Sequence, residues 1–279
     1  MTALLVATAA AALLCLALLA TVLVVRARIA RLDQRTRGRR SEVSTILRTL
    51  LVEEGTAPPP RSTSTLHAVA SVVTRVHGED RDALQSWLDA NGATAIAKQG
   101  MRDRRAIERA RAIRLYVRTT TEPSRVLMVR MLDDPDARVR GVAALEWGST
   151  GRTEAIAPVL AAACRAEHRL PPLVASIAIM RCRLLDVESL HAAWSTRDPD
   201  GLRVALSTGS AAGLPGVQPH AIAALANDDP LVRIAAADAL RRVGTRRSLE
   251  PLRERLPLET NPIARRHLDE AIATLGGGS

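Results

Sequence analysis

The sequence predicts an all-α protein in which stacked helical hairpins form an α-solenoid behind one N-terminal transmembrane helix. The 279 residues include no Phe, one Tyr and three Trp, and the Ala, Leu and Arg runs lack the aromatic and β-branched residues that strands prefer. A pattern at residues 132–151 returns at residues 227–244, with Val139 and Val232 93 residues apart. Repetition at a fixed spacing is typical of solenoids. The first 25 residues are almost wholly apolar.

Residues 1–25 are expected to be a membrane anchor. The run TALLVATAAAALLCLALLATVLVV, residues 2–25, carries no charge, and 24 helical residues at about 1.5 Å each exceed the roughly 30 Å hydrocarbon core of a bilayer. A cleavable signal peptide would have a basic segment before a shorter apolar run. Lipoprotein attachment at Cys15 is disfavoured because Leu14 stands where a small residue is expected. We therefore expect an uncleaved single span.

The charge that follows this run predicts its orientation. The formal net charge is +10, and cytoplasmic flanks of membrane spans carry the excess of basic residues. No Lys or Arg precedes the apolar run, so we expect the bulk of the chain in the cytoplasm at the cell membrane. The Arg cluster after the run is either an orientation signal or a contact with anionic lipid head groups, and the two uses are compatible. Opposed only by Asp33, it consists of Arg26, Arg28, Arg31, Arg35, Arg37, Arg39 and Arg40.

Three further segments are expected before the repeats. Residues 26–55 combine the basic cluster with a short amphipathic helix, whose apolar face contains Val43, Leu47 and Leu51. Residues 56–65 contain three consecutive prolines, which favour an extended spacer, although a proline-recognising domain could bind them. Residues 66–100 are expected to form a divergent helical cap or repeat. At the other end, residues 276–279 are expected to be a disordered tail.

Helix starts recur along residues 101–275. Asp or Asn can accept from the free N–H groups of a first turn, and Pro fits the first helical position. The pairs Asp134-Pro135, Asp198-Pro199, Asp229-Pro230 and Asn261-Pro262 are separated by 64, 31 and 32 residues. A unit of about 32 residues fits if a degenerate member lies near Pro171-Pro172. Each pair therefore predicts the start of a helix.

The unit at residue 229 contains the clearest helical hairpin. Its apolar residues fall on one helical face, Gly244 ends the helix, and SLEPLRERL begins a second one. One hairpin cannot bury both faces, so stacked neighbours must supply the core. The face consists of Val232, Ala235, Ala236, Ala239, Leu240 and Val243, and the second helix offers Leu249, Leu252 and Leu256.

These residues resemble the HEAT-repeat family, in particular its short bacterial units. The pattern D-P-x-V-R-x-x-A-A-x-A-L-x-x-x-G is nearly complete in DPLVRIAAADALRRVG and partial in DARVRGVAALEWGSTG. The resemblance is strong in the units at 134 and 229 and weak around 166–197. It implies a right-handed α-solenoid that presents surfaces to partners. A few branches, such as bilin lyases and certain DNA-repair glycosylases, are enzymes.

No arrangement of residues predicts catalysis, a cofactor or a metal. The six His residues are scattered and the cysteines 15, 164 and 182 are isolated, so no zinc or disulfide spacing occurs. The acidic pairs, such as Asp228-Asp229, stand at expected helix ends, where capping explains them. No phosphate-binding glycine pattern is present. We therefore expect a protein without enzymatic activity and predict no small-molecule substrate.

An arginine series at roughly the repeat spacing is the strongest candidate site. Aligned by stacking, it would bind an acidic protein segment, phosphate groups or nucleic acid. The favoured alternative is that each Arg bonds a helix-terminal carbonyl or the Asp of the adjacent turn, a use that the resemblance implies. The aromatic residues are too few and too dispersed to stack bases, so nucleic acid is disfavoured. The series consists of Arg109, Arg140, Arg203, Arg233 and Arg265.

Taken together, these features predict a non-catalytic, membrane-anchored adaptor. Its cytoplasmic repeats would hold a protein partner on their concave side, within a membrane-associated assembly. Two alternatives stay open. One is an enzyme or chromophore-handling protein similar to the bilin lyases, although no catalytic residue of those families matches a position in this chain. The other is nucleic-acid binding by the arginine series, which would weaken steeply with salt.

Overall fold

A computed structural model describes the chain except for residues 1–37, 39, 54, 183–187, 195–197 and 278–279. All regular structure in the described part is helical, as the composition predicts. The expected span at 2–25 and most of the Arg cluster lie outside the described residues. Within the part that is described, no helix is both long and apolar enough to cross a bilayer. The chain divides into a first unit, residues 1–91, and a second unit, residues 92–279.

The first unit contains a helix over residues 40–51, α2 (Thr63–Val73) and α3 (Glu79–Ala90). Ile46 of the first helix is fully buried, as are Leu84 and Leu88 of α3, which packs on α2. The Ser62 side chain caps α2 by accepting from the Thr65 N–H.

The segment at 56–65 differs from the expected extended spacer. Helix α2 begins within it, at Thr63. Ala57 is buried, and the Arg61 N–H donates to the Glu42 carboxylate at 2.7 Å. The three prolines do prevent a helix over residues 55–60. The segment is nevertheless bonded back to the helix at 40–51 through the Glu42 carboxylate.

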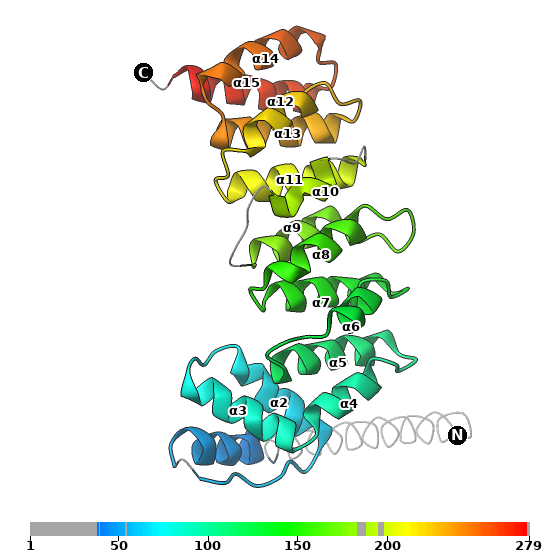
Figure 1. Ribbon diagram of the computed structural model, residues 1–279, viewed down its shortest axis with the longest axis vertical. Helices are drawn as coiled ribbons and strands as arrows, with labels where there is room; N and C mark the ends of the chain where they lie inside the picture. Colours follow the sequence, from blue (N-terminus) through cyan, green and yellow to red (C-terminus); the bar gives the residue numbers. More distant parts are fainter. Residues whose placement is uncertain (1–37, 39, 54, 183–187, 195–197, 278–279) are drawn as a thin grey trace, which may run out of the picture. The chain divides into compact units, whose positions relative to one another are not determined.

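In the second unit a long helix and a short helix alternate (Figure 1). Each long helix packs on the next long one, and each short helix packs on the long helix that follows it. This serial packing is that of an α-solenoid. The long helices are α5 (Ala106–Thr119), α7 (Ala137–Gly148), α9 (Pro172–Met180), α11 (Pro199–Ala211), α13 (Pro230–Val243) and α15 (Pro262–Gly276). The short ones are α4 (Ala93–Gly100), α6 (Arg125–Met131), α8 (Ile156–Ala163), α10 (His191–Trp194), α12 (Val217–Ala224) and α14 (Leu249–Arg255).

Most of the predicted helix starts are confirmed. Asp198, Asp229 and Asn261 each cap a helix through the side chain, and each is followed by Pro at the first helical position. The Asp229 carboxylate, for example, accepts from the Leu231 N–H at 2.8 Å. Helix α9 begins at Pro172, where the degenerate unit was expected.

The prediction for Asp134-Pro135 is wrong. Helix α7 begins at Ala137, and its cap is Asp136, which accepts from the Arg138 N–H at 2.8 Å. Asp134 is buried and accepts from the Asp136 N–H at 2.9 Å. The 93-residue offset between Val139 and Val232 in fact aligns Asp136, not Asp134, with Asp229. Asp134 therefore occupies a position two residues before the cap.

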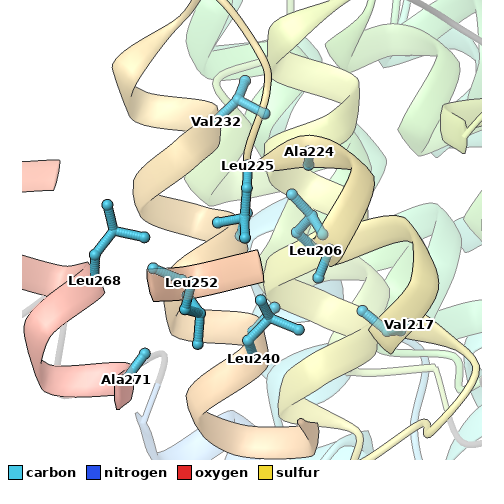
Figure 2. Close-up of a cluster of buried hydrophobic side chains, with 13 residues drawn as sticks. Leu206, Val217, Ala224, Leu225, Val232, Leu240, Leu252, Leu268 and Ala271 are labelled. Carbon is cyan, nitrogen blue, oxygen red and sulfur yellow. The ribbon is translucent and has the colours of Figure 1, made fainter. Parts of the chain in front are cut away.

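The core of the last repeats is shared between successive helices, as stacking requires. Figure 2 shows Leu206 of α11, Leu240 of α13, Leu252 of α14 and Leu268 of α15 converging on one cluster. Ala236, Ala237 and Ala239 of α13 are fully buried. Such small side chains let neighbouring helices approach closely, which explains how a core forms almost without aromatic residues.

Candidate functional site

The arginine series occupies two different positions on its helices. Four of the arginines stand four residues after the N-cap residue of their helix. They are Arg109, Arg140, Arg233 and Arg265. Arg203 stands five residues after its cap, Asp198. Because one residue turns the helix by about 100°, Arg203 points in a different direction from the other four.

Arg233 is held inside the protein. Its Nε and Nη2 donate to the two oxygens of Glu259 at 2.6 and 2.7 Å, and its Nη1 donates to the carbonyls of Asn227 and Asp228, both at 2.8 Å. The side chains of Arg233 and Glu259 are 6% and 0% exposed. This bidentate bond lowers the pKa of Glu259 to about 2 and raises that of Arg233. It ties α13 to the segment that precedes α15.

The same arrangement recurs in the earlier units. Arg109 donates to both oxygens of Asp134, each at 2.7 Å, and to the carbonyls of Asp103 and Arg104. Asp134 and Glu259 hold equivalent places, since each also accepts from the N–H of the cap residue two positions later. Arg140 donates to the Asp134 carbonyl at 2.7 Å and reaches the Arg169 carbonyl at 3.2 Å.

Arg169 is a member of this network that the sequence analysis missed. It pairs with Asp198, at 3.3 Å, and with Asp200, which links the weak unit to α11. It stands two residues before Pro171, the residue that precedes α9, whereas the arginines of the series stand four or five residues after the corresponding residue of their own helices. The only signal for it in the sequence is its separation from Asp198 and Asp200, 29 and 31 residues, which approximates one repeat.

The geometry therefore favours the structural use of the series over a continuous partner-binding ladder. The guanidinium groups of Arg109, Arg140 and Arg233 are engaged within the repeats. Arg203 is half-buried and donates to Asp200 at 3.0 Å. Arg265 is exposed and forms no ion pair with any described residue. Partner contact by Arg203 or Arg265 remains a prediction.

A groove runs across α9, α11 and α13 in the second unit. Its volume is about 780 Å³, and its lining includes Leu173, Ile177 and Met180 of α9, Arg203 and Ser207 of α11, and Leu231, Asp238 and Arg242 of α13. On α9, the apolar residues lie at i, i+4 and i+7 on one face. Leu173 is 71% exposed and Met180 is 53% exposed. This surface gives a docking partner apolar area to bury.

Charged groups border the groove on α13. Asp238 is engaged by His267, at 2.9 Å, and lies 3.6 Å from Arg241. Arg242 is exposed and makes no ion pair among the described residues. The side facing α9 is thus apolar, and the far side offers an uncompensated positive charge.

A second pocket, of about 580 Å³, lies beside Trp194 and His220. Their rings stack with centroids 4.3 Å apart and an angle of 7°. Burial and the neighbouring His191 lower the pKa of His220, which favours its neutral form. Trp147 is fully buried and Trp87 nearly so, so the three Trp residues form no common stacking surface.

No group of three or more His, Cys, Asp or Glu in the described residues has a geometry that could hold a metal ion. Burial raises the pKa of the Cys164 thiol to about 11, with a further contribution from Asp198, and burial alone raises that of Cys182 to about 11.

We expect Cys164 and Cys182 to react slowly with iodoacetamide at neutral pH, because only the thiolate is nucleophilic and very little forms far below a pKa of about 11. Mass spectrometry of peptides alkylated in the native and the urea-unfolded chain measures the ratio of the two alkylation rates. We expect at least about ten-fold slower modification in the native chain. Equal rates in the two states would contradict the burial of these thiols.

Comparison with known proteins supports the repeat architecture. A family model described as HEAT repeats matches residues 187–273, which include α11 to α14 and most of α15. This part of the chain is therefore similar to HEAT repeats. The unit at 134, whose pattern is also close, lies outside the matched range. No curated protein matches the chain.

Proposed function

We propose that the protein is a non-catalytic, membrane-anchored adaptor whose repeats bind a protein partner in the groove of α9, α11 and α13. The observation that carries the proposal is the exposed apolar face of Leu173, Ile177 and Met180 opposite Leu231. HEAT repeats are generally protein-interaction scaffolds, and residues 187–273 match them. The anchor and the cytoplasmic location rest on the uncharged run at 2–25 and the Arg cluster after it.

The lining defines the kind of partner that fits. Apolar residues at i, i+4 and i+7 complement an amphipathic helix, which docks by inserting residues of the same spacing into a groove. Arg242 lies on the opposite side without a counter-charge. The partner segment therefore has an apolar face toward α9 and an acidic residue toward Arg242.

The test is recovery of a protein partner from crosslinked native membranes by the tagged full chain. We expect a Leu173→Glu and Leu231→Glu double variant to recover about ten-fold less partner, or less still. Binding would bury two charged side chains in place of two apolar contacts. The matched control is Val126→Glu with Leu258→Glu, since these residues are also exposed, 79% and 67%, and lie outside the groove. Equal recovery by both variants would exclude the groove. A chain that recovers no partner but turns over a substrate would exclude the adaptor.

A further inference from the structure

The first unit has a separate groove between the helix at 40–51 and α2, which we call the N-terminal groove. Its volume is about 600 Å³, and it is lined by Arg40, Val43, Ser44, Leu47, Arg48, Leu51, Val52 and Ala68. Val52 is 76% exposed. Ile46 of the same helix is fully buried in the unit, so the groove is a second apolar surface beside the side that packs on the core.

Both charges on the rim of the groove are positive. Arg40 and Arg48 are exposed, and neither forms an ion pair with a described residue. Two carboxylates of this segment accept hydrogen bonds away from the two arginines, Glu42 from the Arg61 N–H and Glu53 from the Thr49 hydroxyl. An apolar floor with a basic rim complements the level of a bilayer at which acyl chains meet anionic head groups. Arginine suits this level because its stem is apolar and its end is charged.

The expected span would also hold the groove near a bilayer. Only residues 26–39 separate the expected span from Arg40, and they contain six arginines. Fourteen residues reach at most about 50 Å when fully extended. A span ending at residue 25 would therefore keep the groove within this distance of the membrane surface.

We propose that the N-terminal groove lies against an anionic membrane surface, with Val52 and Leu51 at the acyl-chain boundary and Arg40 and Arg48 on lipid phosphates. The inference rests on the proposed anchor for its proximity to the bilayer. It extends membrane contact from the basic segment to the folded first unit. The groove then fixes the orientation of that unit at the membrane.

A polarity-sensitive fluorophore on a Val52→Cys variant of the full chain tests this contact. The chain is reconstituted into vesicles of phosphatidylcholine alone or of phosphatidylcholine with phosphatidylglycerol. We expect emission at shorter wavelength and loss of quenching by acrylamide only in the vesicles with phosphatidylglycerol. A Val126→Cys variant, labelled at an equally exposed site of the second unit, is expected to stay quenched in both. The unsubstituted chain measures the background from Cys15, Cys164 and Cys182.

A label at position 52 that stays quenched in anionic vesicles overturns the inference. Shielding that is the same in both lipids also overturns it, because the contact then does not depend on anionic head groups. Shielding that persists in detergent overturns it as well, because the chain itself or a second copy would then cover the groove. Flotation of the vesicles after alkaline carbonate reports on the anchor separately. If carbonate extracts the chain, the proposed anchor is wrong. The contact of the groove is then tested separately, by measuring the shielding of the label at position 52 after the chain is added to anionic vesicles.

Charge-neutral variants test the role of the rim. Arg40→Gln with Arg48→Gln, combined with Val52→Cys, is expected to lower the ratio of shielded to exposed label in anionic vesicles by about 30-fold, since each Arg near such a surface contributes about 1 kcal/mol. The control carries Arg104→Gln and Arg247→Gln, two exposed arginines of the second unit, and is expected to keep the ratio. An unchanged ratio in the first variant would overturn the proposed contact with phosphates.

Discussion

Replacing Glu259 with Gln is expected to lower the free energy of unfolding by roughly 3–5 kcal/mol, because it leaves the buried guanidinium of Arg233 without a counter-charge. Glu259 is buried and accepts two bonds from Arg233, one from the Asn261 N–H and a longer one, of 3.5 Å, from Arg255. The substitution keeps the volume, removes the charge and replaces one accepting oxygen by a donating NH2 group. Urea unfolding of the full chain, followed by far-ultraviolet circular dichroism, measures the loss.

Two further variants separate the lost charge from other effects. Glu254→Gln changes an exposed carboxylate in the preceding helix and is expected to shift the unfolding free energy by less than about 0.5 kcal/mol. Replacing both partners, as Arg233→Met with Glu259→Leu, is expected to recover much of the loss, since the buried guanidinium is then removed together with its carboxylate. Arg255, which also contacts Glu259, is 23% exposed and keeps access to water. A Glu259→Gln variant as stable as Glu254→Gln would show that the buried pair does not hold the repeats together.

The same pair predicts a dependence on pH. The pKa of Glu259 is about 2 in the folded chain and 4.5 when unperturbed, so the unfolded state binds this proton more tightly. The stabilisation by Glu259 is therefore complete above pH 4.5 and is lost as the pH falls toward about 2. The shift corresponds to about 3 kcal/mol. Over this range the difference in unfolding free energy between the native chain and Glu259→Gln is expected to shrink, and a constant difference would contradict the assignment.

Local chemistry explains which parts of the fold could be predicted. The caps at Asp229 and Asn261 depend on a side chain and a proline within one turn, so a dipeptide is enough to find them. Asp134-Pro135 has the same letters but a different role. Whether an Asp caps a helix or receives an arginine from the preceding repeat depends on a partner 25 residues away. That information is not contained in the dipeptide.

The groove across α9, α11 and α13 could not be predicted from the sequence for a related reason. Helix α9 is apolar on nearly all sides, with Ser176 as its one polar residue, and Ala175 and Ile179 are buried while Leu173 and Ile177 are exposed. Periodicity identifies a buried face only where polar residues mark the opposite one. The position of α11 and α13 decides which side of α9 is open. The displacement of Arg203, in contrast, is visible in the sequence, because Arg203 stands five residues after Asp198 whereas Arg233 stands four after Asp229. An approximate repeat spacing alone does not reveal it.

Gly148 and Gly141 belong to the same helix, α7, and are expected to respond to alanine in opposite directions. A Cβ on Gly148 would lie 2.8 Å from the carbonyl carbon of Ala178 and 3.0 Å from its Cα. These are backbone atoms of α9, which packs on α7. They cannot move unless the two helices separate, so Gly148→Ala is expected to cost roughly 1–3 kcal/mol or more.

At Gly141 the added methyl group meets only Cγ1 of Val174, at 3.8 Å, an ordinary contact. Gly141→Ala is therefore expected to stabilise the chain by roughly 0.5–1 kcal/mol, since alanine loses less conformational freedom in a helix interior. Urea unfolding of the two variants beside the unsubstituted chain measures both signs. If both alanines stabilise, α7 and α9 are not in close contact at Ala178. If Gly148→Ala destabilises and Gly141→Ala does not, the close approach of α7 and α9 at Gly148 excludes side chains larger than glycine there, whatever their helix propensity.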